Sequence, residues 1–311
     1  MATNGVISAD DRVASKLVTV IVLHWARPDL TRKCLSSLQG LEPLDAPWRV
    51  EVRVVDNGSG DAPAPRGDER LPWGIQSLER NYGYAGGNNR GLRAALDAGS
   101  DAVLLLNNDA IVEPSSLRLL LQTLAARPGA GAIGPAILRL DGRTVESLGH
   151  AFDGRTGRHK ELLRDAPVAA LPRGPRSVDG VSGCAFLMAR AALQHVGLFD
   201  ERFYLYFEDL DWCLRSRSAG FSVWADGRAR VRHTGGGTIG KMSPAATFYG
   251  LRNHLWVADR HGSRTAIQRR IRPWLILGYH LAYLAWTPRG RTLPHVRAVL
   301  HAMRMRNQAG S

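Results

Sequence analysis

The alternation of two apolar patterns constrains the fold of this chain more than any other feature of its sequence. Short apolar runs rich in β-branched residues are followed by stretches in which apolar residues recur at helical spacing. The expected strands are Leu17 to His24, Val50 to Val55 and Ala102 to Leu106, and the expected helices follow Asp29, Asn89 and Pro114. This order predicts an α/β fold with a mostly parallel central sheet flanked by helices. Such sheets bind their ligands at the carboxyl ends of the strands.

The second half of the chain has weaker periodicity. The polar stretch from Arg139 to Arg176 fits either a hairpin or a mobile loop. After it we expect a strand within Val178 to Ala189, helices over Ala191 to Val196 and Glu208 to Ala219, and short strands over Phe221 to Asp226 and Ala229 to His233. Beyond Gly240 the chain is helical and basic, which predicts a boundary there.

The net charge of +13 is concentrated near the carboxyl end of the chain. Between Gly227 and Ser311 there are fourteen arginines and one lysine, but the single acidic residue is Asp259. A basic segment of this kind suits anionic lipid, nucleic acid or a phosphorylated partner. The alternative is a solvated arginine-rich surface, because the whole chain favours arginine over lysine.

The cysteines and the first residues indicate a reducing, cytoplasmic compartment. Cys34, Cys184 and Cys213 are odd in number and lack zinc-site spacing, so the sequence indicates neither a disulfide framework nor structural zinc. Residues 1–16 include the charged run Asp10 to Arg12 and no apolar core. This pattern argues against a secretory signal and predicts a disordered lead-in.

Polar residues follow two of the predicted strands at the point where each ends. One strand runs into Asn107-Asn108-Asp109, and the strand before it in the chain ends on Asp56 and Asn57. A carboxylate at this edge can bridge a hard divalent cation to a diphosphate, which makes Asp109 a candidate metal ligand. The other four residues are candidates for nucleotide contacts. Both segments are also compatible with simple turn chemistry, because Asn and Asp tolerate left-handed backbone angles.

A segment from Gly83 to Gly91 is rich in small residues and reads as a loop before a helix. Gly86, Gly87 and Asn88 at its centre would let backbone N–H groups approach an anionic ligand closely. The spacing does not match the dinucleotide fingerprint, and the chain contains no P-loop motif. These two absences argue against hydride transfer and P-loop chemistry.

Two acidic residues begin a predicted helix directly after an aromatic run. Glu208 or Asp209 in this position is a candidate general base, although helix capping alone would also explain the pair. Asp211 lies four residues before Arg215 on the same helical face, so an ion pair is its expected role.

His233 follows the last predicted strand and precedes a glycine-rich turn. A neutral imidazole at this place would complete a metal site with Asp109. The alternative is a packed histidine that makes ordinary hydrogen bonds.

Taken together and in this order, the segments resemble the family 2 glycosyltransferases of the GT-A fold, in particular the bacterial rhamnosyltransferase-like branch. The resemblance covers roughly residues 17–238 and is carried by VTVIVLHWARPDLTRKCLSSL, VVDNGS, NYGYAGGNNRG, LLLNNDA, VSGCAFLMAR, VGLFDERFYLYFEDLDWCLR and RHTGGGT. It implies a GT-A catalytic domain over 17–240, with a nucleotide-sugar half to about residue 112 and an acceptor half from 113. A helical, basic C-terminal segment would then occupy 241–311.

The resemblance also implies an activity and its residues. The enzyme would transfer a sugar, with rhamnose a candidate, from a dTDP- or UDP-linked donor to a hydroxyl acceptor with inversion. The acceptor would be a saccharide, a lipid-linked saccharide or a natural product, as in cell-wall or polysaccharide biosynthesis. Asp56 would contact the nucleobase, Gly86 to Asn89 would line the nucleoside pocket, Asp109 would bind Mg²⁺ or Mn²⁺, and Asp209 would deprotonate the acceptor.

The chain departs from the family pattern at two places. Asn107 replaces the first acid of the DxD-like motif, so the metal would bind mainly together with the nucleotide, with help from His233. His24 and Ala26 replace the asparagines common after the first strand, which leaves the nucleotide base open.

Two other functions fit parts of the sequence. A sugar-1-phosphate nucleotidylyltransferase would share the sheet and the metal carboxylate, but its glycine-rich loop should follow the first strand, where this chain has Trp25-Ala26-Arg27-Pro28. A non-catalytic nucleic-acid-binding module would use the basic C-terminal segment. Because that segment is separable from the motifs, we favour sugar transfer and expect no nucleic acid.

The apolar run from Pro273 to Trp286 has aromatic residues at both ends and arginines on both flanks, within residues 269–291. It is too short to span a bilayer, which takes about 20 residues. It would suit a helix lying on the inner face of an anionic membrane. The alternative is a buried helix that packs on the catalytic domain or across a homodimer interface.

Overall fold

A computed structural model describes residues 15–235, 243–262, 265–286 and 293–305. Its strands are β1 (Lys16–His24), β2 (Trp48–Asp56), β3 (Trp73–Ser77), β4 (Ala102–Asn107), β5 (Ala110–Val112), β6 (Ala130–Arg139), β7 (Val145–Ser147), β8 (His150–Asp153), β9 (Arg158–Glu161), β10 (Pro175–Ser177), β11 (Ala185–Ala189) and β12 (Ser222–His233). Its α-helices are α1 (Pro28–Gln39), α2 (Gly83–Asp97), α3 (Ser116–Ala125), α4 (Arg190–Val196), α5 (Glu208–Ser218), α6 (Pro244–His261), α7 (Ala266–Trp286) and α8 (Leu293–Met305). Short 3-10 turns occur at Val168–Ala170 and Glu201–Phe203.

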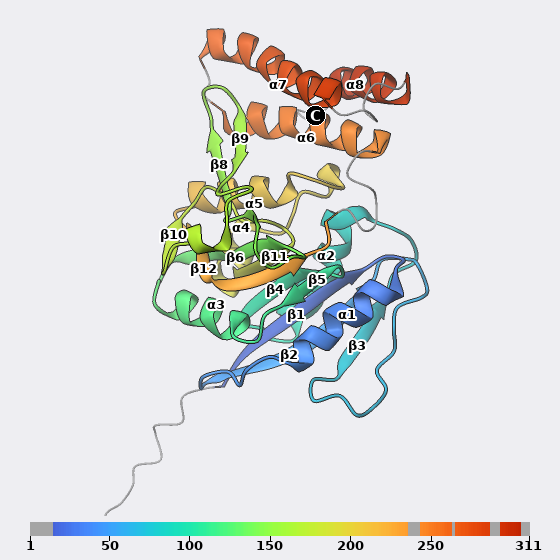
Figure 1. The fold of residues 1–311 in the computed structure, drawn as a ribbon, viewed down its shortest axis with the longest axis vertical. Helices are drawn as coiled ribbons and strands as arrows, with labels where there is room; N and C mark the ends of the chain where they lie inside the picture. Colours follow the sequence, from blue (N-terminus) through green and yellow to red (C-terminus); the bar gives the residue numbers. More distant parts are fainter. Residues whose placement is uncertain (1–14, 236–242, 263–264, 287–292, 306–311) are drawn as a thin grey trace, which may run out of the picture.

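The central sheet has the strand order β10-β12-β6-β11-β4-β1-β2-β3. Strands β3, β2, β1 and β4 are mutually parallel, β12 runs parallel to β6, and β11 lies antiparallel between β4 and β6. Figure 1 shows the sheet in the lower body of the molecule with helices on its faces. The mostly parallel sheet predicted from the alternation of strands and helices is confirmed. Its helices cover both faces, as the buried apolar strands require.

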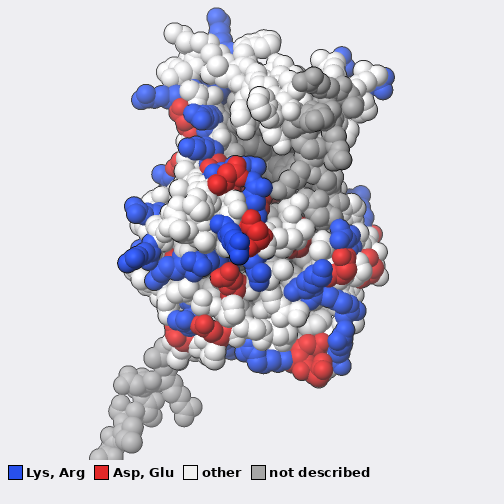
Figure 2. All heavy atoms as spheres, viewed as in Figure 1, with Lys and Arg blue, Asp and Glu red and all other residues white. Residues whose placement is uncertain are grey.

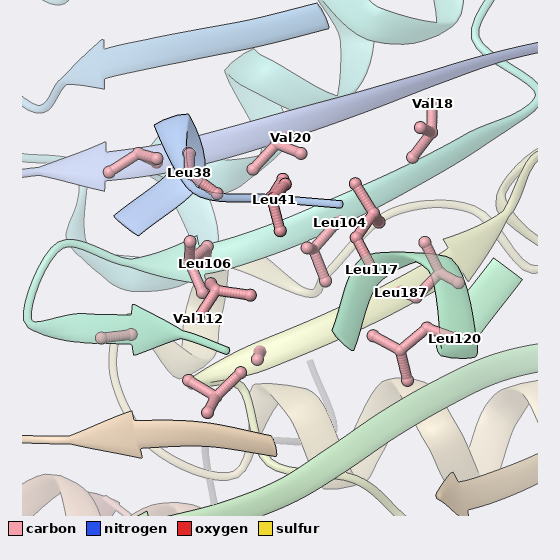
Figure 3. Close-up of a cluster of buried hydrophobic side chains, with 14 of the residues drawn as sticks. Val18, Val20, Leu38, Leu41, Leu104, Leu106, Val112, Leu117, Leu120 and Leu187 are labelled. Carbon is pink, nitrogen blue, oxygen red and sulfur yellow. The ribbon is translucent and has the colours of Figure 1, made fainter. Parts of the chain in front are cut away.

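Two apolar clusters cover the two faces of the sheet. Alternate residues of each central strand point to opposite sides, so Leu104 and Leu106 belong to one cluster and Val103 and Leu105 to the other. Helices α1 and α3 pack on the first face, where Figure 3 shows side chains from both helices against those of the strands. Helices α2, α4 and α5 contribute to the second cluster. The sheet is thereby held rigidly between helical layers.

The polar stretch that fitted either a hairpin or a loop contains a hairpin, in which β8 pairs with β9. Two later predictions were wrong. The two short strands expected before His233 are one strand, β12, because a bulge between Asp226 and Arg230 carries the chain past its Asp-Gly pair. The strand expected within Val178 to Ala189 begins only at Ala185. Before it, Gly180 forms an isolated bridge with His150 of β8, and the backbone N–H of Gly183 donates to the Asp209 side chain instead of to a strand.

The glycine-rich segment predicted as a loop is helical, because α2 begins at Gly83. A side-chain carbon added to Gly87 would lie 2.7 Å from Leu23, and one added to Gly91 would lie 2.9 Å from Val55. These glycines therefore allow α2 to pack closely on strands β1 and β2. Their main effect is on helix–sheet distance rather than on loop flexibility.

Helices α6, α7 and α8 form a further layer, drawn at the top of Figure 1. They share an apolar cluster that includes Leu255, Ile276 and Val299. A second cluster joins Trp256 and Val257 of α6 to Phe203 and Leu210 in the body of the protein. The C-terminal extension is thus helical, as predicted, and α6 is packed on the sheet domain.

Two predicted boundaries fall partly or wholly outside the described residues. The disordered lead-in was predicted for 1–16, of which the described part begins at residue 15, and β1 already starts at Lys16. The boundary near 240 also lies outside the described residues. Among the helices that are described, none is both long enough and apolar enough to cross a bilayer.

Candidate active site

Strand register brings the predicted polar residues to one edge of the sheet. His24 pairs with Asp56 across β1 and β2, and Leu23 pairs with Asn107 across β1 and β4. A pocket of about 630 Å³ opens at this edge, as expected for a parallel sheet. Residues on its wall include Trp25, Asn57, Tyr84, Asn107, Asn108 and Asp109.

His233, the last residue of β12, lies at the same pocket, although β12 is separated from β4 by two strands in the sheet. In the antiparallel pairing of β12 with β5 it lies opposite Ala110, which sets it beside Asp109. Its Nε2 lies 3.2 Å from Oδ1 of Asp109, and its Nδ1 lies 3.1 Å from Oε2 of Glu146. The three side chains are largely buried. The structure therefore brings together the two predicted metal-binding residues and adds Glu146.

The groups around His233 stabilise the positive charge of its protonated ring. Burial disfavours the imidazolium, but Cys184 and the carboxylates of Asp109 and Glu146 outweigh it and raise the pKa of His233 above its usual value. A cation that binds Asp109 and His233 has to displace this proton, so its binding is expected to weaken at low pH.

These residues fit a divalent metal ion. Asp109 offers a carboxylate oxygen and His233 a ring nitrogen, while Glu146 holds the other ring nitrogen, as carboxylates commonly do for metal-binding histidines. In the part of the chain that the structure describes, no group of three or more His, Cys, Asp or Glu side chains forms a metal site. Further ligands would have to come from a bound molecule or from water.

The predicted acidic pair begins α5, with its two carboxyl groups in different surroundings. Asp209 accepts hydrogen bonds from the backbone N–H of Gly183 at 2.8 Å and from that of Leu210 at 2.7 Å. Glu208 is buried, and its Oε2 has no hydrogen-bond partner among the described residues. Burial and repulsion from Asp209 raise the pKa of Glu208 well above its usual value.

Asp209 is the member of this pair whose carboxylate is stabilised by hydrogen bonds. Burial raises its pKa as well, but the N–H groups of Gly183 and Leu210 oppose the rise by stabilising the carboxylate. The phenol of Tyr84, which lines the pocket, donates to the carbonyl of Gly183 at 2.5 Å. Asp209 therefore lies directly behind the pocket wall formed by Tyr84.

Sequence reasoning missed the histidines near Asp209. Nε2 of His150 lies 4.0 Å from Oδ2 of Asp209, and the rings of His150 and His159 are 4.8 Å apart. Burial lowers the pKa of His150 to about 4, so this imidazole is neutral at physiological pH. Both residues come from the β8–β9 hairpin, where the weak periodicity of the sequence gave no signal.

Only some of the predicted nucleotide-binding residues line the pocket. Asn57, Asn107 and Asn108 line the pocket, whereas Asp56 is buried beneath it. Both carboxylate oxygens of Asp56 accept hydrogen bonds from its own loop, at the backbone N–H groups of Ser59 and Gly60 and the Ser59 hydroxyl. A contact between Asp56 and the base stays a prediction.

The residues predicted from the glycine-rich segment lie in the first turns of α2. Gly86, Gly87 and Asn88 are buried, and the pocket wall includes their neighbours Gly83 and Tyr84 instead. The Asn88 side chain donates to the Tyr84 carbonyl at 3.1 Å. A direct nucleoside contact from these three residues is untested.

The aromatic run before α5 forms another part of the pocket wall. Tyr204 and Tyr206 both have positive φ angles, which single out a strained turn. The side chain of Asn253 in α6 donates to the carbonyls of Phe203, Leu205 and Tyr206, and holds this turn in place. Helix α6 therefore supports the pocket from the C-terminal side.

Solved structures with the same arrangement of elements identify the fold. A mannosyltransferase from Pyrobaculum calidifontis, solved with GDP-Man and Mn²⁺, has a TM-score of 0.59 at 17% identity, covering 96% of this chain and 89% of its own. Residues 1–349 of TarS from S. aureus have a TM-score of 0.57 at 16% identity, covering 94% of this chain and 80% of that one. The fold is that of the GT-A glycosyltransferases.

The sequence itself gives the family. The family described as "Glycosyltransferase like family 2" matches residues 16–254, and the chain belongs to this family. An N-acetylglucosaminyl-diphospho-decaprenol L-rhamnosyltransferase of Mycobacterium tuberculosis is 30% identical over 296 residues, covering 85% of this chain and 92% of the relative. The low-salt glycan biosynthesis hexosyltransferase Agl10 of Haloferax volcanii is 28% identical over 66% of this chain and 63% of the relative. The resemblance to rhamnosyltransferases noted in the sequence is confirmed.

Proposed function

We propose that this glycosyltransferase inverts the anomeric carbon of a hexose as it transfers the sugar from a nucleoside diphosphate to an acceptor hydroxyl. The observation that supports this proposal is the pairing of two different acidic sites around one pocket. The Asp109–His233 pair lies on the pocket wall, and Asp209 lies behind Tyr84 and Gly183 of the same wall. One site suits a diphosphate and its cation, and the other suits proton removal.

In the proposed reaction Asp209 accepts the proton of the acceptor hydroxyl. The acceptor oxygen then forms its bond to the anomeric carbon as the bond from that carbon to the diphosphate oxygen breaks. The electron pair leaves with the nucleoside diphosphate, and a single displacement inverts the carbon. When bound at Asp109 and His233, Mg²⁺ or Mn²⁺ would supply positive charge to the diphosphate.

The names of relatives support a narrower proposal for the substrates. The M. tuberculosis relative is named for rhamnosyl transfer and for a diphospho-decaprenol-linked sugar. We therefore propose rhamnose as a candidate sugar, dTDP or UDP as the nucleotide, and a lipid-linked saccharide as the acceptor, as in cell-wall or polysaccharide biosynthesis. The alternative of a nucleic-acid module loses support, because Arg252 and Arg272 of the basic segment are buried among protein groups.

A donor screen tests this function. In the presence of Mg²⁺ or Mn²⁺, the correct nucleotide sugar is expected to raise the melting temperature, since a ligand at 100 times its Kd stabilises the folded state by about 2.7 kcal/mol. The same donor should be hydrolysed slowly to the nucleoside diphosphate. Anomeric NMR of the transfer product checks inversion. Retention of configuration, or binding of nucleic acid without any donor effect, would contradict the proposal.

We also propose that the enzyme contacts the inner face of an anionic membrane through α7. One face of α7 packs on the protein through Ile276 and Leu284. Its other face is unusually apolar for a surface, with Trp274 68%, Tyr279 62% and Trp286 89% exposed. In Figure 2 the upper layer is largely white, with basic side chains at its margins. The proposal combines both alternatives for this helix, which packs on one side and offers apolar area on the other.

Vesicle sedimentation measures this contact. The full-length protein is expected to sediment with phosphatidylglycerol vesicles at low salt and to be released at high salt. The double variant Trp274→Ser/Trp286→Ser should bind the vesicles about tenfold or more weakly, because two large apolar side chains no longer enter the interface. Leu140→Ser, an exposed apolar residue of the sheet domain, is the control and should bind normally. Equal binding by both variants would favour a packing role for α7.

A further inference from the structure

A second pocket lies between α6 and α8, outside the candidate active site. Its volume is about 710 Å³. Helix α8 contributes Arg297, His301 and Arg304, which lie on one helical face at spacings of four and three residues. Helix α6 contributes Phe248 and Tyr249, and the rings of Phe248 and His301 pack with centroids 4.9 Å apart. The pocket thus combines two guanidinium groups with an aromatic wall.

None of the described residues that line this pocket is acidic. Within the described parts of α6, α7 and α8 the single carboxylate is Asp259, and no ion pair is found for Arg297 or Arg304 among the described residues. Two arginines that face a cavity without a carboxylate are suited to a phosphate group, because guanidinium binds phosphate oxygens through paired hydrogen bonds. The expected ligand is therefore an anion with several oxygen atoms.

This pocket adjoins the candidate active site. Ala245 and Tyr249, which lie one turn apart on α6, line both cavities. The ring of Tyr249 stacks on that of Tyr204, with centroids 5.1 Å apart, and Tyr204 lines the pocket of the candidate active site. A molecule bound between α6 and α8 can therefore extend past Tyr249 toward the site of sugar transfer.

The rim of the pocket is apolar on the side that faces solvent. Leu293, Val296 and Leu300 are each more than half exposed and recur at helical spacing along α8. Leu300 also lines the pocket. Helix α8 packs beside α7 on α6, so its exposed apolar residues belong to the same layer as the apolar face of α7 (Figure 1). An anionic group in the pocket would thus lie beside a surface suited to hydrocarbon.

We propose that the α6–α8 pocket binds the phosphate groups of a lipid-linked acceptor. Arg297 and Arg304 would contact the phosphate oxygens, and Leu293, Val296 and Leu300 would contact the lipid chain. The saccharide would then reach past Tyr249 to the pocket that contains Asp109. This proposal rests on the proposed function. It assigns binding of the lipid-linked acceptor to residues outside the sheet domain.

Binding of simple probes to the full-length protein tests the site without donor or turnover. Farnesyl diphosphate is expected to bind, inorganic diphosphate to bind at least about tenfold more weakly, and farnesol not to bind measurably. The double variant Arg297→Gln/Arg304→Gln should lose about 10- to 100-fold in affinity for farnesyl diphosphate, because each lost bond to a charged group is worth about a factor of ten. Arg269→Gln/Arg270→Gln removes the same charge from exposed positions of α7 and should bind normally.

The outcomes distinguish a specific phosphate site from general attraction of anions to a basic surface. Equal loss in both double variants would mean general attraction to anions and would overturn the proposal, as would equal affinity for farnesyl and inorganic diphosphate. Arg297→Lys/Arg304→Lys keeps the charge and should retain part of the affinity, which preserves the test if the glutamine pair folds poorly. Hydrolysis of nucleotide sugar should be normal in all three variants. If the wild-type protein does not hydrolyse any nucleotide sugar, the proposed function is contradicted, but the binding result for this pocket stays valid.

Discussion

Replacing Asp209 by Asn is expected to lower turnover by about 10²- to 10⁴-fold and to leave donor binding nearly unchanged. The amide has almost the shape of the carboxylate and can still accept the hydrogen bond that Gly183 donates. It cannot accept a proton from the acceptor at neutral pH. Steady-state transfer kinetics, with donor binding measured by calorimetry, check this result.

The paired acid provides the control for this variant. Glu208 is buried, and burial together with repulsion from Asp209 raises its pKa well above the usual value, so Asp209 is the proposed base. Glu208→Gln should therefore retain most of the turnover. In the wild type, kcat/KM should fall as the pH drops through the raised pKa of Asp209, because the protonated acid no longer accepts a proton. Near-normal turnover in Asp209→Asn would disprove the assignment.

Much of the sheet and part of the site could be predicted from local sequence patterns. The apolar runs that form β1 and β4 are buried on both faces, so their apolar character is continuous and easy to recognise. In β2 the valines alternate with charged residues, which is also a recognisable strand pattern. Their polar ends meet because parallel strands align their carboxyl termini. Asp109 and His233 were predicted as partners, and the pairing of β5 with β12 explains why residues so distant in sequence meet.

Other parts of the site depend on contacts that local patterns do not reveal. Glu146 and His150 lie in the short strands β7 and β8, within a polar stretch whose weak periodicity gives no register. The side chains that they meet, His233 and Asp209, are distant in sequence. The glycines of α2 favour a loop by propensity, but close packing on the sheet overrides it. Asn253, which fixes the turn around Tyr206, lies in a segment that the sequence separated from the catalytic motifs.

Replacing Asp109 by Ala is expected to abolish metal-dependent donor binding, with a loss of more than about 100-fold. Even residues that only orient a metal ligand typically change metal affinity by about 10- to 100-fold, and Asp109 would bind the cation directly. His233→Ala should weaken binding less or alter the preference between Mg²⁺ and Mn²⁺. Glu146→Gln should act through His233, because its carboxylate lies 3.1 Å from Nδ1 of that ring. Calorimetric titration of donor with and without each metal measures all three effects.

Two comparisons make the metal test decisive. Asp97→Ala removes an exposed carboxylate at the end of α2 that does not line the pocket, and should bind donor and metal normally. Wild-type enzyme in EDTA should resemble Asp109→Ala, since both lack the cation that neutralises the diphosphate. Equal donor binding and turnover in EDTA and in Mn²⁺ would rule out the metal role for Asp109 and His233 together. The basic side chains near the pocket would then have to stabilise the leaving diphosphate by direct hydrogen bonds.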